Sequence, residues 1–97
     1  MWILETDESV PDRAAFRLPS GAVKTIGRST GAEFIVDAPL VSRLHCQLTA
    51  AGDRLHVKDL DSTNGTFVNG TRVTSATLQH GDRLKVGRVE LTISKTD

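Results

Sequence analysis

Residues 66–73 read Thr66-Phe67-Val68-Asn69-Gly70-Thr71-Arg72-Val73, and this stretch decides the fold class. Within it, Asn69-Gly70 forms a two-residue gap between two short runs that favour strands. Both central residues of a type I′ turn need positive φ, which Asn and Gly tolerate well, and this turn matches the twist of paired strands. The stretch therefore predicts a β-hairpin.

The segments on either side of the hairpin also favour strands. Glycines cut the chain into pieces that are mostly too short for helices of average length. Apolar and polar residues alternate, which predicts strands with one buried face, in 16–18, 55–58, 84–86 and 89–94. Residues 34–36 predict a short strand covered on both faces, and residues 2–4 predict a first strand before an exposed acidic loop over 5–13. Many short strands with regular turns indicate an all-β sandwich or small barrel.

Residues 37–51 fit two interpretations. Asp37 can cap a helix, because apolar residues recur at helical spacing after it. In the alternative, residues 38–44 form a loop and residues 45–49 form a strand that turns Cys46 inward. Periodicity does not decide between them, because short apolar runs fit both elements.

The composition limits the domain organisation and excludes several functions. A chain of 97 residues suits one domain over 1–97. Its 12 Lys and Arg balance 12 Asp and Glu, so it lacks the overall positive charge that attracts nucleic acids or anionic membranes. No apolar stretch approaches the about 20 residues of a membrane span. The acidic N-terminal segment is unlike a signal peptide, so we expect a cytoplasmic location.

Cys46 is the only cysteine in the sequence. A single cysteine excludes an internal disulfide and a zinc site built from several cysteines. We expect Cys46 to be a small buried side chain, which is common for a free cysteine.

Four short motifs follow one another along the chain: Gly27-Arg28, Ser-Arg-Leu-His at 42–45, Asp-Leu-Asp-Ser-Thr-Asn-Gly-Thr at 59–66, and Asn69-Gly70. In this order and spacing they resemble the forkhead-associated (FHA) domain, a phosphothreonine-peptide binding module, over nearly the whole chain. The resemblance implies a β-sandwich of about eleven mostly antiparallel strands in two sheets, with the binding loops at one end. It also favours the loop and strand over the helix in residues 37–51.

The residue types in these motifs suit a phosphothreonine ligand. A phosphate of charge about −1.5 to −2 needs a fixed cation and several donors on short side chains. The guanidinium of Arg28 can bind two oxygens at once, and the amide of Asn64 offers the donor and acceptor that a peptide backbone needs. We therefore expect the phosphate to contact Arg28, Ser42, Arg43 and Thr63, and the peptide backbone to contact Asn64.

Three further residues are expected to support the site without touching the phosphate. Gly65 permits the tight turn that presents Asn64. The resemblance implies that Gly27 is structural and that His45 braces the binding loop from behind. Neither a metal nor a cofactor is expected.

We expect a non-catalytic module that binds a phosphothreonine-containing protein, either a kinase or a kinase substrate, and that does not bind nucleic acid or membrane. Three charge-assisted hydrogen bonds of about 1.5–3 kcal/mol each are comparable with the roughly 8 kcal/mol of micromolar binding. Recognition is therefore expected to depend on the phosphate. We expect a monomer.

Other functions remain open at this point. The first is an FHA-like scaffold that binds its partner without phosphate. The second is an enzyme with Ser42 as nucleophile, His45 as base and Asp59 or Asp61 as orienting acid, although the sequence around Ser42 has no oxyanion-hole motif. The third is a nucleic-acid binder that uses Arg72 with other arginines, which the scarcity of aromatic residues disfavours.

Overall fold

The computed structural model describes residues 1–7 and 13–96, and within them the chain forms eleven β-strands. The strands are β1 (Trp2–Thr6), β2 (Ala15–Leu18), β3 (Val23–Gly27), β4 (Phe34–Ile35), β5 (Cys46–Ala51), β6 (Arg54–Asp59), β7 (Thr66–Val68), β8 (Thr71–Val73), β9 (Ser75–Leu78), β10 (Arg83–Val86) and β11 (Val89–Lys95). The expected all-β fold of about eleven strands is confirmed.

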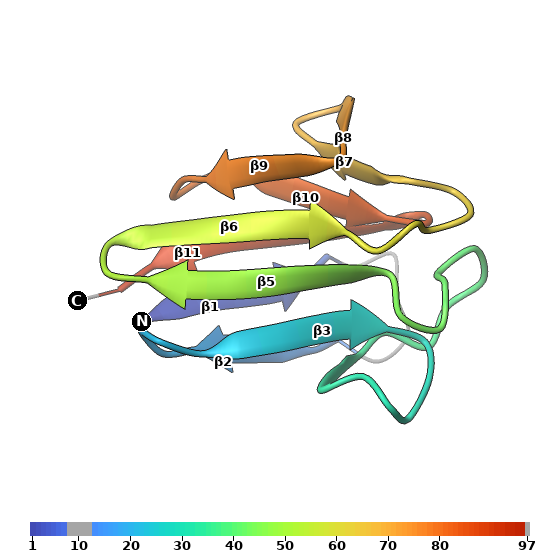
Figure 1. Cartoon of the computed structure of the whole chain (residues 1–97), viewed down its shortest axis with the longest axis horizontal. Coiled ribbons are helices and arrows are strands. Elements are labelled where there is room, and N and C mark those ends of the chain that lie inside the picture. The colour runs from blue at the N-terminus through green and yellow to red at the C-terminus, as the bar shows by residue number, and fades with distance from the viewer. Residues whose placement is uncertain (8–12, 97) are drawn as a thin grey trace.

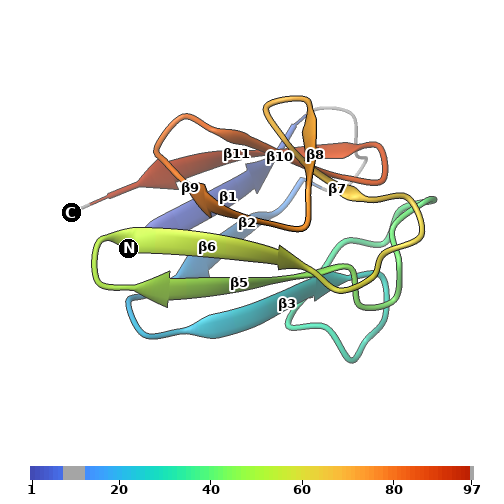
Figure 2. The ribbon, with the colours of Figure 1, turned by 45° about the horizontal axis from the view of Figure 1, so that its top comes forward.

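The described strands form two sheets that pack face to face (Figure 2). One sheet has six strands in the order β2-β1-β11-β10-β7-β8, and the other has five in the order β4-β3-β5-β6-β9. Adjacent strands are antiparallel except for β3 and β4, which run parallel. Tight turns between consecutive strands explain this bias, because a two-residue turn can join only an antiparallel pair.

The core lies between the two sheets, where alternate residues of each strand point inward. Its fully buried apolar side chains include Leu4, Leu18, Ile26, Leu48, Leu55, Leu84, Leu91 and Ile93. Each buried side chain of this size contributes about 1.5–3 kcal/mol relative to an exposed one. Cys46 is also fully buried, as its residue type predicted.

The edge strands β2 and β4 close one side of the sandwich. Phe16 and Phe34 stack there with ring centroids 4.6 Å apart. The prediction that residues 34–36 are covered on both faces is wrong, because the Ile35 side chain is 44% exposed. The described strands form only two sheets, so Phe34 points into the core between them while Ile35 lies on the outer face of its sheet.

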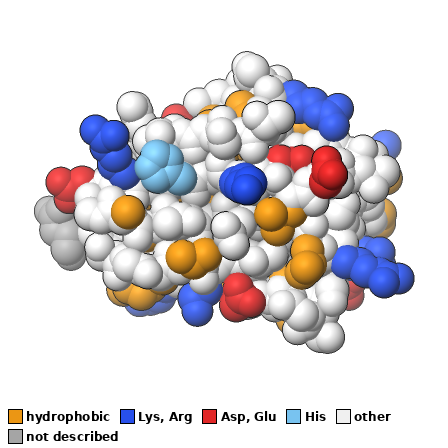
Figure 3. All heavy atoms as spheres, in the orientation of Figure 1, with side chains coloured by type: hydrophobic (Ala, Val, Ile, Leu, Met, Phe, Trp, Pro, Cys, Tyr) orange, Lys and Arg blue, Asp and Glu red, His pale blue; other side chains and the backbone are white. Residues whose placement is uncertain are grey.

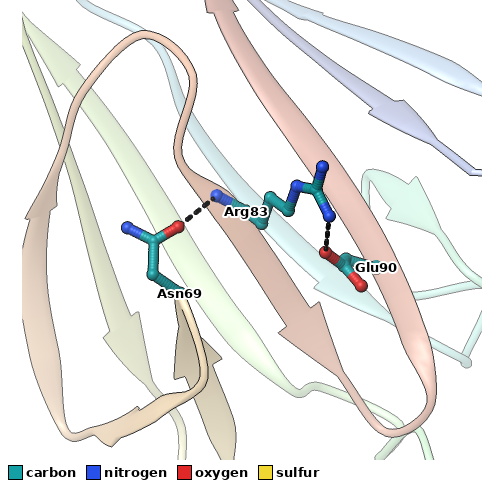
Figure 4. Close-up of polar contacts among 3 residues, drawn as sticks. All are labelled: Asn69, Arg83 and Glu90. Atoms are coloured by element: carbon teal, nitrogen blue, oxygen red, sulfur yellow. Dashed lines mark hydrogen bonds and ion pairs between the residues drawn. The ribbon is translucent and has the colours of Figure 1, made fainter.

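The Asn69-Gly70 turn joins β7 and β8, which confirms the predicted hairpin. The φ angles of Asn69 and Gly70 are 50° and 84°, so both residues lie in the left-handed region. The side-chain oxygen of Asn69 also accepts a hydrogen bond of 2.9 Å from the backbone N–H of Arg83 in β10, and the Arg83 guanidinium lies 3.4 Å from the Glu90 carboxylate (Figure 4). The turn residue therefore fixes the hairpin and also attaches it to the next strand.

Residues 37–51 form a loop and a strand, which confirms that alternative over the helix. The strand β5 pairs with β3 on one side and with β6 on the other. These two ladders satisfy its backbone hydrogen bonds, with β6 through a tight turn and with β3 across a gap of about twenty or more residues. The apolar spacing within residues 37–51 does not reveal either pairing.

The first strand is longer than the sequence predicted. β1 continues from residue 4 to Thr6, because it pairs with β11 as far as Leu91. The predicted acidic loop over 5–13 therefore begins later, and its residues 8–12 lie outside the described part of the chain.

Candidate functional site

Three loops meet at the end of the sandwich opposite both termini, on the right in Figure 1. They are residues 28–33 after β3, residues 36–45 before β5 and residues 60–65 after β6. Between them lies a cleft of about 490 Å³, lined by Arg28, Asp37, Ala38, Pro39, Leu40, Val41, Ser42, Thr63 and Asn64. The fold thus brings four of the five expected ligand residues, Arg28, Ser42, Thr63 and Asn64, around one cleft.

Arg28 follows directly after the last residue of β3 and is exposed at the cleft. Its backbone N–H donates to the Ser42 carbonyl oxygen at 3.0 Å, and its side-chain Nε donates to the Val41 carbonyl oxygen at 3.1 Å. Among residues 1–7 and 13–96, no hydrogen bond or ion pair engages its two terminal nitrogens. The guanidinium is therefore oriented by Val41 while its outer edge is left for a ligand.

Gly27 is buried directly against residues 36–45. A Cβ atom at Gly27 would lie 1.9 Å from the Arg43 carbonyl oxygen, so only glycine permits this approach. The approach lets Ser29 N–H donate to the same Arg43 oxygen at 3.2 Å. Arg43 thus supports the site through its backbone, and its exposed side chain is not among those lining the cleft.

Two polar contacts tie residues 60–65 to residues 36–45. The Thr63 backbone N–H donates to the Ser42 hydroxyl oxygen at 3.1 Å, and the Asn64 side-chain nitrogen donates to the Leu40 carbonyl oxygen at 3.0 Å. Because the Thr63 N–H is already engaged, the hydroxyl is the one donor that this residue can offer a ligand. Ser42 retains its hydroxyl hydrogen, and Asn64 retains its amide oxygen.

His45 lies fully buried behind the cleft and bridges the same two loops. Its Nδ1 accepts a hydrogen bond of 3.0 Å from the Ser42 backbone N–H. The ring proton is therefore on Nε2, which donates to the Gly65 carbonyl oxygen at 2.8 Å. These contacts support the expected bracing role, and they give the ring no contact with the Ser42 hydroxyl, which a serine nucleophile would need.

Asp59 anchors the start of the loop that carries Thr63 and Asn64. Its carboxylate accepts hydrogen bonds from the Ser62 hydroxyl at 2.6 Å, the Thr66 hydroxyl at 2.7 Å and the Ser62 backbone N–H at 3.2 Å. Burial alone raises the pKa of the Asp59 carboxyl, but these bonds together with the nearby His45 lower it below its ordinary value overall.

The role of Asp59 escaped the sequence interpretation, which considered it only as the orienting acid of an enzyme. The available signal is an Asp at a strand end followed three residues later by Ser, a spacing typical of a side chain that caps a turn. Its charge also acts below the loop. Burial, and to a smaller extent the charge of Asp59, raise the pKa of the Cys46 thiol to about 12. A hydrogen bond with Thr66 opposes this shift but is outweighed.

The charges that act at the cleft come from nearby side chains and not from an overall charge of the chain, whose formal net charge is zero. The face in Figure 3 mixes acidic and basic side chains, in keeping with the formal net charge of zero, and Lys and Arg side chains are present at the end that carries the loops. Asp37 also lines the cleft, which the sequence interpretation missed. Within the described residues there is no helix able to span a membrane and no group of three metal-ligating side chains.

A model of the FHA domain family matches residues 24–87 of the chain. The match begins in β3 and ends after β10, so it contains all three cleft loops. A solved structure from a structural and functional analysis of phosphothreonine-dependent FHA domain interactions superposes with a TM-score of 0.85 at 30% identity. The similarity covers 99% of this chain and 97% of that one.

Two curated relatives come from Mycobacterium tuberculosis. The chain is 40% identical over 81 residues to the ABC transporter ATP-binding/permease protein Rv1747, and 32% identical over 81 residues to the glycogen accumulation regulator GarA. Both alignments cover 84% of this chain, but only 9% of Rv1747 and 50% of GarA. The chain therefore spans no more than half the length of these relatives.

Proposed function

The chain belongs to the FHA family, and we propose that its loop cleft binds a phosphothreonine residue of a partner protein in Ser/Thr kinase signalling. The chain acts as a single non-catalytic recognition module. Its partner is a phosphorylated kinase or kinase substrate in the cytoplasm, and the module binds as a monomer without a cofactor.

The orientation of the Arg28 guanidinium carries this proposal. Its Nε donates to the Val41 carbonyl oxygen, its two terminal nitrogens remain available, and Arg28 lines the same cleft as the hydroxyl residues Ser42 and Thr63. A phosphate is a dianion with three acceptor oxygens, and these groups are donors. Arg43 contributes further positive charge at the rim. An arginine fork and short hydroxyl side chains form a site that favours phosphate over a carboxylate, which has only two oxygens.

The remaining site residues have supporting roles in this proposal. Asn64 hydrogen-bonds the backbone of the peptide next to the phosphothreonine, through the amide oxygen and the N–H that Leu40 leaves free. Gly27, Gly65 and His45 hold the loops at the distances that this geometry requires. The ligand therefore meets side chains that are already fixed, which lowers the ordering cost of binding.

The test is a titration of three matched peptide libraries, phosphothreonine, phosphoserine and unphosphorylated, against the wild type, Arg28→Ala and Arg54→Ala. Arg54 is an exposed arginine at the start of β6, and the cleft loop 60–65 follows the other end of that strand. We expect micromolar binding of phosphothreonine peptides that Arg28→Ala weakens at least about 100-fold, because it removes two charge-assisted hydrogen bonds. Arg54→Ala is expected to bind like the wild type. Equal binding of all three libraries would contradict the proposal and indicate a phosphate-independent scaffold.

A further inference from the structure

A second arginine lies directly beside the loop that carries Asn64. Arg72 belongs to β8, and its side chain lies against the Cα of Gly65. A Cβ atom at Gly65 would be 2.7 Å from Arg72 Nε and 3.0 Å from its Cζ. The absence of a side chain at Gly65, whose φ is 91°, therefore gives the guanidinium its place next to the cleft.

The charge of Arg72 is not neutralised within the described residues. Arg72 is exposed, and its side chain makes no hydrogen bond or ion pair in residues 1–7 and 13–96. By contrast, the exposed Arg83 in β10 has Glu90 at 3.4 Å, and Lys95 has Asp53 at 3.4 Å. An exposed arginine packed against the binding loop and lacking a carboxylate is available to a ligand.

Arg72 is also the first residue of a basic strip on the outer face of the six-stranded sheet. Phe67 pairs with Arg72 on one side and with Lys85 on the other, so the three side chains lie side by side on one face. The Lys85 ammonium lies 6.0 Å from the centre of the Phe67 ring, within the range of a cation–π contact. We call Arg72, Phe67 and Lys85 the Arg72 strip.

We propose that Arg72 is a specificity-determining residue that binds an Asp or Glu side chain of the phosphorylated partner, at a position flanking the phosphothreonine on the Asn64 side of the cleft. The inference rests on the proposed function, which assigns the peptide backbone to Asn64, the residue before Gly65. A carboxylate suits this place, because one planar guanidinium can bind both of its oxygens.

The cleft also carries a negative charge, Asp37, which disfavours acidic peptide residues near it. Asp37 lines the cleft in the loop before β5, whereas Arg72, in β8, lies against Gly65, the residue that follows Asn64. Acidic residues of a peptide are therefore repelled near Asp37 and attracted near Arg72. This charge asymmetry gives the bound peptide a direction as well as a preferred residue.

The experiment scans one phosphothreonine peptide with Ala, Asp and Lys at each flanking position in turn. We expect the wild type to prefer Asp over Ala about fivefold at one position, the scale of an exposed ion pair. Arg72→Gln is expected to abolish that preference while binding of the Ala peptide changes less than about twofold, and Arg72→Glu is expected to prefer Lys at the same position. Arg54→Gln is the matched control, and thermal unfolding checks the fold of each variant.

The outcomes separate this inference from the proposed function. If phosphothreonine peptides bind but no position prefers Asp, Arg72 does not select the partner, and the phosphothreonine site stands. If Arg72→Gln weakens the Asp and Ala peptides equally, Arg72 only supports the loop through Gly65, and the inference is overturned. If no phosphothreonine peptide binds the wild type, both proposals fail.

Discussion

The Gly27→Ala variant is expected to lose stability and peptide binding together, because its methyl group would collide with the backbone of residues 36–45. The added Cβ would lie 1.9 Å from the Arg43 carbonyl oxygen, where an ordinary contact needs about 3.4 Å. The obstacle is backbone, which cannot rotate away as the end of a flexible side chain can. The loop must therefore move by about 1.5 Å, the difference between these two distances.

That movement disturbs two backbone hydrogen bonds, Arg28 N–H to Ser42 at 3.0 Å and Ser29 N–H to Arg43 at 3.2 Å. Overpacking costs about 1–3 kcal/mol, and each weakened bond about 0.5–1.5 kcal/mol. The expected loss in free energy of unfolding is about 2–6 kcal/mol. This is a large share of the about 5–15 kcal/mol that is typical of a whole domain. For a domain of this size the unfolding midpoint falls by at least about 8 °C.

The assay is thermal and urea unfolding of the wild type, Gly27→Ala and Gly31→Ala, followed through the fluorescence of the buried Trp2. Gly31→Ala is the matched control, because a Cβ there would meet only the Ser29 hydroxyl, at an ordinary distance of 3.5 Å. Phosphothreonine-peptide affinity is measured at a temperature where each variant is folded. A wild-type midpoint together with wild-type affinity in Gly27→Ala would refute the reasoning that this close approach positions Arg28.

Two further residues give separate predictions. His45→Ala leaves the buried Gly65 carbonyl without its partner, so we expect a loss of about 2–4 kcal/mol in urea unfolding and weaker peptide binding; unchanged values would contradict its role as a brace. The pKa of Asp59 is lower in the folded protein than its ordinary value of 3.8, so its stabilising contribution is complete above about pH 4 and is lost as the pH falls through the folded pKa. Asp59→Asn is expected to flatten that acid loss in unfolding free energies measured from about pH 6 to about pH 2, and parallel curves for wild type and variant would exclude Asp59 as its source.

The parts of the fold that depend on neighbouring residues could be predicted from the sequence. The Asn69-Gly70 hairpin follows from the φ angles that these two residues tolerate, and both angles are positive in the structure. Alternation in residues 55–58 and 89–94 likewise identified inward-facing side chains, because a strand has a period of two. By contrast, residues 37–51 fit a helix equally well until β5 acquires partners on both sides.

The parts that depend on distant contacts could not be predicted in the same way. Gly27 was expected to be structural only through the family resemblance, since its steric reason is a carbonyl group sixteen positions later in the chain. The attachment of Asn69 to Arg83 adds a tertiary contact that the hairpin pattern does not contain. The same limit explains Ile35, whose exposure depends on its lying on the outer face of a two-layer sandwich.

In the cleft loops, some atoms hold the loops together and other atoms are available to bind the ligand. Ser42 and Asn64 each contact the opposite loop with one group and leave another group for a ligand, so they connect stability with binding. Within residues 1–7 and 13–96, the terminal nitrogens of Arg28 and the guanidinium of Arg72 make no hydrogen bond or ion pair. Replacing Arg72 therefore costs little folding free energy, and replacing Arg28 costs only its Nε hydrogen bond to Val41. His45 has both ring nitrogens engaged inside the protein, so its removal affects folding first and binding through it. Variants that lower affinity at constant stability therefore identify ligand contacts, whereas variants that lower both identify the frame that positions them.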